Sequence, residues 1–251
     1  MKAHVEGMRS FVYYVGRCFD ILKNSDDEAE KALYQGLTDL LTPLVKAYCA
    51  QRGFDVCIQA MQVYGGYGYT REYPIEQLAR DCKIASIYEG TDGIQAMDLL
   101  GRKLGMDEGK VFMGFMGEVQ KVMARAREAQ GLGPLADKLE KALNQLGETA
   151  LHLGKKAVSA EFKTAFAHAF PFLETMGDIT MAWMLLWRAS IAAEKLNNGA
   201  KKKDVNFYEG QLKTAEFFIQ TVIPVTCGKM DSIRESSGAA VTISEASFGG
   251  L

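Results

Sequence analysis

The sequence predicts an all-α fold built from two helical bundles in succession. Along most of the 251 residues, apolar side chains recur at alternating steps of three and four, which places them on one face of a helix. No stretch of useful length shows the strict apolar and polar alternation of a half-buried strand. With 48% hydrophobic residues, a chain of this length can bury a substantial core, as one large domain or two smaller ones.

Three helices are predicted before residue 65. The first ends at residues 24–27, whose polar side chains can also cap the second. A third helix is expected to begin at Thr42 and Pro43, because proline is favoured at the first helical position, and to end at Gly65, a natural left-handed cap. Successive helices of this kind favour an antiparallel bundle. Their apolar faces contain Val5, Met8, Val12, Val15, Phe19, Leu22, Leu33, Leu37, Leu40, Ala47, Ala50, Phe54, Cys57, Met61 and Tyr64.

A glycine-rich turn and two further helices follow. Pro74 opens a short helix expected over residues 75–80, and residues 81–86 form either another turn or its continuation. Asp92 and Gln95 have the spacing of a capping box, which predicts a helix over about residues 93–103. Glu89 therefore lies just ahead of a helix N-terminus.

A second all-helical section is expected after residue 104. Asp107 can cap its first helix, residues 131–134 interrupt the pattern, and Pro224 bends or ends the last long helix. The predicted division is a first bundle at residues 1–104, a second bundle at 107–234 and a flexible tail, rich in Ser, Gly and Ala, at 235–251. The apolar positions of the second bundle include Leu139, Leu143, Leu146, Ala150, Leu153, Ala157, Phe172, Met176, Ile179, Trp183, Leu186, Tyr208, Leu212, Ala215, Ile219 and Val222.

Composition argues against several classes of partner. A formal charge of -2 provides no basic field for nucleic acid or an anionic membrane, and the longest wholly apolar run, residues 181–187, is too short to span a bilayer. The first residues lack the features of a signal peptide, so we expect a cytoplasmic protein. The five scattered cysteines, Cys18, Cys49, Cys57, Cys82 and Cys227, suit reduced thiols, and burial as small hydrophobic side chains explains them best.

Few residues can carry chemistry. The three histidines, His4, His152 and His168, are too few and too far apart to predict a metal site, and we expect each to be structural. The run GGYG at residues 65–68 follows a helix, so it is not a dinucleotide fingerprint of the Rossmann type. It is best explained as a helix cap and turn. The alternative is a backbone nest for an anionic phosphate, with Gln62 adding an amide one turn earlier.

Glu89 has two interpretations. An acidic residue near a helix N-terminus is stabilised by the helix dipole, and this alone can account for it. Alternatively, the neighbouring Ile87 and Tyr88 provide apolar surroundings that raise a carboxylate's pKa towards the value that a general base requires. Spacing by itself favours the first interpretation.

Four ordered stretches resemble the C-terminal helical domain of acyl-CoA dehydrogenases: QVYGGYGY at residues 62–69, EYPIE at 72–76, RDCKI at 80–84 and IYEGTDGIQ at 87–95. Residues 1–104 resemble the last helices of that domain. Residues 107–234, with PFLETMGD at 171–178, resemble the additional C-terminal helical domain of a larger subgroup of the family.

This resemblance implies the dehydrogenation of an acyl-CoA thioester, with Glu89 as the base that removes the α-proton and FAD as the hydride acceptor. It implies that Gly90 lies against the substrate. It also implies a homo-oligomer and an electron-transfer flavoprotein as the electron acceptor. The residues that it places beside FAD are Thr91, Asp92 and Gly93 within one subunit, and Gln62, Gly65 and Gly66, which reach the FAD of a neighbouring subunit.

Compared with the family, the chain lacks the N-terminal helical domain, the middle β-domain and the first helix of the C-terminal domain, and it contains no Arg-x-x-Phe-Gly stretch. Its first helix has no good N-cap, which suggests a segment of something longer. We therefore expect these residues to bind flavin weakly or not at all by themselves. Two hypotheses remain: the C-terminal portion of an FAD-dependent acyl-CoA dehydrogenase, or a non-catalytic helical module for self-association or partner contact that retains a vestigial site.

Overall fold

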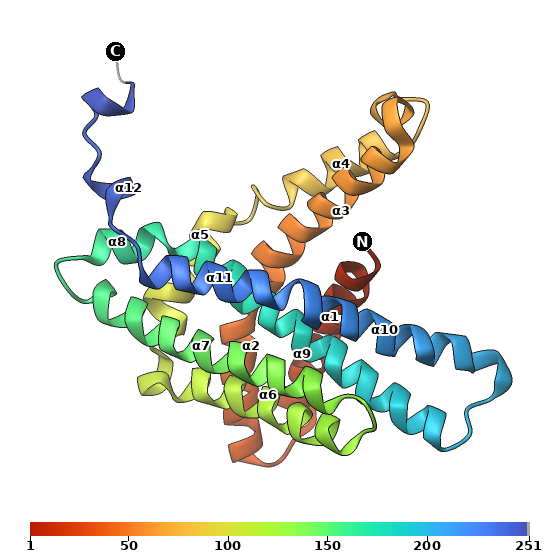
Figure 1. The fold of residues 1–251 in the computed structure, drawn as a ribbon. Coiled ribbons are helices and arrows are strands. Elements are labelled where there is room, and N and C mark those ends of the chain that lie inside the picture. Colours follow the sequence, from red (N-terminus) through yellow and green to blue (C-terminus); the bar gives the residue numbers. More distant parts are fainter. Residues whose placement is uncertain (250–251) are drawn as a thin grey trace.

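A computed structural model describes residues 1–249, and every regular element in that range is helical (Figure 1). The predicted all-α fold class is confirmed. None of the helices in this range is both long enough and apolar enough to cross a membrane. The α-helices are α1 Lys2–Asn24, α2 Glu28–Pro43, α3 Cys49–Tyr64, α4 Ile75–Ile84, α5 Asp92–Asp98, α6 Lys110–Glu128, α7 Gly133–Ala157, α8 Phe162–Ala167, α9 Ala169–Asn197, α10 Val205–Thr221, α11 Ile223–Arg234 and α12 Ala239–Thr242.

Helix α9 lies at the centre of the fold. It is buried on nearly all sides, as expected of a helix with apolar side chains around its whole circumference. It packs against α1, α6, α7, α10 and α11, so the helices on both sides of residue 104 contribute to one apolar core. The division at residues 104–107 stays a prediction.

The expected helix start at Pro43 is wrong. Pro43 is buried inside a nearly continuous helical run from Glu28 to Tyr64, in which a π-helical turn, η1 (Leu44–Tyr48), joins α2 to α3. Proline removes one backbone donor and its ring crowds the preceding turn, and the wider π turn begins directly after it. The apolar face continues through this point, so burial of residues on both sides outweighs the lost hydrogen bond. Its fully buried members are Leu37, Leu40, Leu41, Leu44 and Ala47.

A buried hydrogen-bond network fixes η1 against α9 and α11. Tyr48 Oη donates to Asp178 Oδ1 at 2.6 Å, and Thr226 Oγ1 donates to Asp178 Oδ2 at 2.9 Å. Asp178 is only 2% exposed, and Arg52 lies 3.7 Å from its carboxylate. Burial raises the pKa of Tyr48 well above its usual value, so the hydroxyl keeps the proton that it donates. The Tyr48 ring lies directly over Gly177.

Two predicted caps are also wrong. Thr91, and not Asp92, caps α5, because Thr91 Oγ1 accepts the N–H of Ile94 at 3.3 Å. Asp107 does not cap α6. It and Glu108 have left-handed backbone angles, with φ of 48° and 55°, and Gly109 precedes the helix. The helix predicted at residues 75–80 continues to Ile84.

Helices α3 and α4 form an antiparallel hairpin that projects from the rest of the molecule (Figure 1). Helix α3 contributes no buried residue. Along the hairpin, Cys57 Sγ and Cys82 Sγ lie 3.5 Å apart. Both thiols are half-buried, as are Cys49 and Cys227, so the expectation of burial holds only for Cys18.

The segment predicted to be a flexible tail contains α12, which packs against α8. A Cβ at Gly238, just before α12, would lie 3.4 Å from Thr164 Oγ1. The last two residues of that segment, 250 and 251, lie outside the described residues.

Replacing Gly177 with Ala should destabilise the fold. A Cβ at this position would lie 2.1 Å from the ring of Tyr48, which is buried and cannot move aside. Overpacking of this kind costs about 1–3 kcal/mol. The matched control is Gly154→Ala on α7, where a Cβ meets nothing within 4 Å and the change should stabilise the helix by roughly 0.5–1 kcal/mol. Urea unfolding measures both, and equal effects would contradict the proposed fit of Tyr48 against Gly177.

His4 should make the fold sensitive to mild acid. Its ring packs edge-on against Phe218, and burial, helped by the charge of Arg52, lowers the pKa of His4. Below about pH 6.5 the His4 imidazole binds a proton in the unfolded chain but stays neutral in the folded chain. The free energy of unfolding therefore decreases as the pH falls below that value. In urea unfolding at pH 7.5 and 5.5, the difference in unfolding free energy should be smaller for His4→Gln than for the wild type. An unchanged difference would rule out this role.

Candidate functional site

Glu89 lies at the apex of a tight turn between α4 and α5. The turn is closed by the N–H of Asp92, which donates to Ser86 O at 3.2 Å, and Ser86 itself is buried. Glu89 has a left-handed backbone with φ of 54°, an unusual conformation for a side-chain-bearing residue. Its side chain is exposed. Ile87 and Tyr88 are 52% and 51% exposed, so they do not enclose the carboxylate in this chain as the sequence had suggested.

Gly90 continues the left-handed turn, with φ of 90°. Glycine suits this conformation, and a Cβ here would lie 2.9 Å from Gln95 Nε2. Within residues 1–249, the N–H groups of Glu89 and Gly90 have no hydrogen-bond acceptor. The turn therefore presents a carboxylate and two free backbone donors together.

The residues after the turn start α5. Thr91 caps the helix, Gly93 is exposed, and Asp92 is half-buried. Asp92 Oδ1 is buried without a hydrogen-bond partner. Burial raises the pKa of the Asp92 carboxyl, and the positive charges of Lys46 and Lys83 oppose that rise.

Lys46 reaches this turn from the π-helical segment η1. Its Nζ donates to Gly90 O and lies 3.8 Å from Asp92 Oδ1. The sequence analysis missed Lys46, because nothing in its local pattern distinguishes it from a solvated lysine. Only the unusual Pro43 three residues earlier signals an irregular helix here.

The second predicted cluster lies at the tip of the α3–α4 hairpin. Gly65 ends α3 with φ of 62°, as predicted. Gly65 and Gly66 are exposed, with open space where side chains would be, and Gln62 is exposed one turn earlier. Gly68 differs, because it is buried and a Cβ there would lie 2.5 Å from Met61 O. Packing thus explains Gly68, whereas Gly65 and Gly66 leave their backbone accessible.

The two clusters lie at opposite ends of the hairpin. Lys46 contacts Gly90 in the Glu89 turn, and Gly65 follows 19 positions later along an almost continuous helix. At 1.5 Å per residue, this separation is about 28 Å. The structure therefore groups the residues from Glu89 to Gly93, and it does not bring Gln62, Gly65 or Gly66 to them within one chain.

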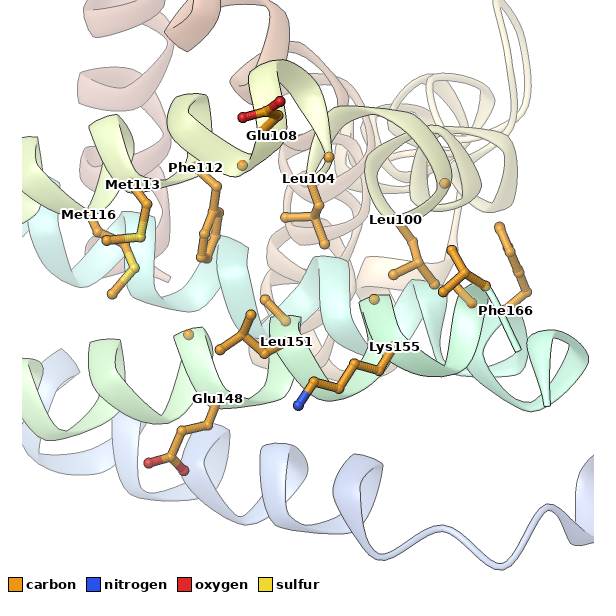
Figure 2. Close-up of a pocket in the computed structure, with 18 of the residues that line it drawn as sticks. Leu100, Leu104, Glu108, Phe112, Met113, Met116, Glu148, Leu151, Lys155 and Phe166 are labelled. Carbon is orange, nitrogen blue, oxygen red and sulfur yellow. The ribbon is translucent and has the colours of Figure 1, made fainter. Parts of the chain in front are cut away.

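A large apolar groove of about 850 Å³ lies elsewhere, among α6, α7, α8 and the helical segments before α6 (Figure 2). Figure 2 shows Leu104 and Phe112 on one wall, Leu151 on the other and Phe166 at one end. None of the predicted site residues lines it. The sequence analysis missed the spacing of Gly147 and Gly154, which lie two turns apart on one face of α7. Because they have no side chains, they leave room for the groove along that wall.

Two family models match the chain. One, described as the acyl-CoA dehydrogenase C-terminal domain, matches residues 1–104, and the other, described as acetyl-CoA dehydrogenase C-terminal like, matches residues 115–244.

Curated relatives match over nearly the whole chain. A broad-specificity linear acyl-CoA dehydrogenase of Mycobacterium tuberculosis is 29% identical over 98% of this chain and 41% of its own length. A 3-methylmercaptopropionyl-CoA dehydrogenase of Ruegeria pomeroyi is 32% identical over 97% of this chain and 41% of its own length. A subunit of the caffeyl-CoA reductase-Etf complex of Acetobacterium woodii is 34% identical over 41% of this chain and 24% of its own length. The chain spans about 40% of the length of the first two relatives.

Solved structures share the fold. Caenorhabditis elegans ACDH-11, in complex with C11-CoA, superposes with a TM-score of 0.71 at 18% identity, covering 97% of this chain and 39% of that one. An acyl-CoA dehydrogenase from Bacillus anthracis, complexed with FAD, gives 0.63 at 18% identity, covering 98% and 42%. The two family models confirm the resemblance seen in the sequence and show that the chain belongs to the acyl-CoA dehydrogenase family.

Proposed function

We propose that this chain forms the C-terminal, base-carrying portion of an FAD-dependent acyl-CoA dehydrogenase. The observation that carries the proposal is the turn at Glu89, which presents a carboxylate beside two backbone N–H groups that have no acceptor within residues 1–249. Removing a proton from the carbon next to a thioester carbonyl requires a base on one side and donors for the developing enolate on the other. One short turn holds both kinds of group.

In this proposal Glu89 accepts the α-proton, and its own N–H donates to the thioester carbonyl oxygen. Gly90 lies against the substrate, where a side chain would crowd the thioester. The exposure of Glu89 in this chain means that the acyl-CoA and surfaces beyond the described residues would have to exclude water from the carboxylate. Acyl-CoA is the substrate class that the names of the relatives support.

The residues present fit FAD at two places. Thr91, Asp92 and Gly93 start α5 beside Glu89, with Thr91 and Gly93 exposed. Gly65 and Gly66 leave accessible backbone that a phosphate or a flavin edge can approach, and Gln62 adds an amide. FAD, when bound, would serve as the acceptor of the hydride from the β-carbon of the acyl group. We propose that these residues hold FAD only together with parts of the protein beyond this chain or with a second subunit.

The proposal includes a homo-oligomer, which the separation of the two clusters supports. If residues about 28 Å apart on one hairpin face two different flavins, the hairpin tip of one subunit completes the site of its neighbour. Exposed apolar side chains on the hairpin suit such an interface; they are Ile58, Val63, Tyr64, Tyr67, Tyr69, Leu78 and Ile84. An electron-transfer flavoprotein is the proposed acceptor, supported by the relative named as part of an Etf complex.

The proposed domain bounds are those predicted from the sequence. In this proposal residues 1–104 carry the base and the flavin-facing elements, and residues 107–234 form the additional helical domain. The flexible tail at 235–251 stays a prediction, and within this segment α12 packs against α8. The alternative is a non-catalytic module for oligomerisation or partner contact. The absence of any buried residue from α3 is expected under both hypotheses, so the substitution of Glu89 decides between them.

Replacing Glu89 with Gln should abolish acyl-CoA-dependent dye reduction by the complete product of the gene, because the amide cannot accept the α-proton. Loss of a general base typically costs about 10²–10⁴-fold in turnover. The matched control is Glu108→Gln, since Glu108 is also an exposed glutamate with a left-handed backbone, and its turnover should equal that of the wild type. Unchanged turnover in the Glu89 variant would favour the non-catalytic module.

Replacing Gly66 with Leu should reduce the flavin content of the assembled protein and leave the fold of each chain intact. A Cβ at Gly66 meets nothing within 4 Å, so the chain itself accommodates a side chain there, while a flavin or partner surface pressed against the turn does not. Gly16→Leu, also unobstructed but on α1, is the control. Flavin absorbance per chain and thermal unfolding are measured for both. Equal flavin content would contradict the proposed role of the hairpin tip.

A further inference from the structure

Lys46 connects the hairpin base to the turn that carries Glu89. Its amine donates to the carbonyl oxygen of Gly90, 44 positions later in the sequence. The lysine side chain is 21% exposed and that of its neighbour Asp92 is 13% exposed, so the contact is partly shielded from water. A half-buried lysine loses hydration, and its hydrogen bond to a backbone carbonyl recovers part of that loss.

The π-helical segment explains why Lys46 points at this turn. A π turn inserts one extra residue into the helix, which rotates the positions that follow it by about 100° relative to the face before it. Within the segment, Tyr48 is buried against Asp178 on α9, and Lys46 reaches the turn before α5. One irregular turn therefore serves both the core and the candidate site.

The contact between Lys46 and Gly90 O stabilises an unfavourable backbone conformation. Glu89 and Gly90 both have positive φ, and a left-handed glutamate persists only where surrounding contacts hold it. The turn has one backbone closure, from the Asp92 N–H to Ser86 O. Lys46 adds a second attachment, at Gly90 O.

A hydrogen bond to Gly90 O also affects the peptide group that this oxygen belongs to. Donation to a carbonyl polarises the whole amide, so the N–H of Thr91, in the same peptide, becomes a stronger donor. Asp92 lies beside the same amine, with Oδ1 3.8 Å from Lys46 Nζ.

From this geometry we propose that Lys46 is a positioning residue for Glu89: it fixes the left-handed turn and thereby aims the carboxylate and its neighbouring N–H groups at the substrate. The proposal rests on the proposed function for its catalytic consequence. Its structural part, the hold of Lys46 on the turn, stands on the contact with Gly90 alone.

A matched control separates this role from simple neutralisation of Asp92. Lys83 is a second cation whose field acts on Asp92, but it lies over the ring of Phe54, and among residues 1–249 it is Lys46 that donates to Gly90 O. If Lys46 only neutralised Asp92, Lys83→Met and Lys46→Met would have similar effects. If Lys46 positions the turn, only its own replacement loosens it.

The test compares Lys46→Met, Lys46→Arg and Lys83→Met with the wild-type chain. Hydrogen exchange of the Asp92 amide, whose bond to Ser86 closes the turn, reports on the conformation without any need for activity. We expect this amide to exchange roughly tenfold faster in Lys46→Met, with partial rescue in Lys46→Arg and no change in Lys83→Met. Amides in the middle of α9 should exchange at wild-type rates in all three, which shows that the fold is intact.

The second readout is acyl-CoA-dependent turnover by the complete gene product. Lys46→Met should lower kcat by about tenfold or more with little change in KM, as expected when an aligned base is disturbed after binding. Wild-type exchange of Asp92, or equal effects of the Lys46 and Lys83 variants, would overturn the inference. Faster Asp92 exchange in Lys46→Met with wild-type kcat would overturn the catalytic part. Retained turnover in Glu89→Gln would instead overturn the proposed function, and the exchange measurement would still decide whether Lys46 holds the turn.

Discussion

The hydrogen bond between Tyr48 and Asp178 is the interaction on which the arrangement of the molecule depends. A carboxylate that is 2% exposed is tolerated only if its oxygens are paired, and here a tyrosine from η1 and a threonine from α11 pair them both. Because α9 carries the carboxylate, the bonds tie η1 to α9 and α11. Gly177 allows the tyrosine ring to approach the α9 backbone. Loss of one partner would leave the other buried and unsatisfied.

Helix positions were largely readable from the sequence, and irregular turns were not. Apolar spacing predicted the all-α fold, and the glycine at position 65 predicted the end of α3 correctly, because a left-handed residue is required there. The prediction of a helix start at Pro43 was wrong, because burial of the residues on both sides outweighs the local preference of proline for that position. Burial is a tertiary effect that a short stretch of sequence does not show. The predicted cap at Asp92 is wrong by one position, because Thr91 Oγ1 accepts the N–H of Ile94.

The candidate site shows the same limit. Sequence motifs identified Glu89 and the residues that follow it, and the family relationship is confirmed. They did not identify Lys46, because a contact across 44 positions has no local pattern. Nor did they indicate that Ile87 and Tyr88 leave Glu89 open to solvent, because enclosure depends on surfaces beyond a short stretch. The roles of Glu89, Gly90 and the flavin-facing residues remain proposals that the described experiments decide.

The projecting hairpin is attached to the rest of the molecule at η1, which leads directly into α3. The glycine turn lies about 28 Å beyond Lys46, so a tilt of only about 5° at the base would displace the tip by roughly 2.5 Å, close to the length of a hydrogen bond. The accuracy with which the tip meets another surface is therefore set at the base, where Tyr48 is bonded to α9 and Lys46 to the Glu89 turn. The two contacts at the base therefore set the direction of an arm that is about 28 Å long.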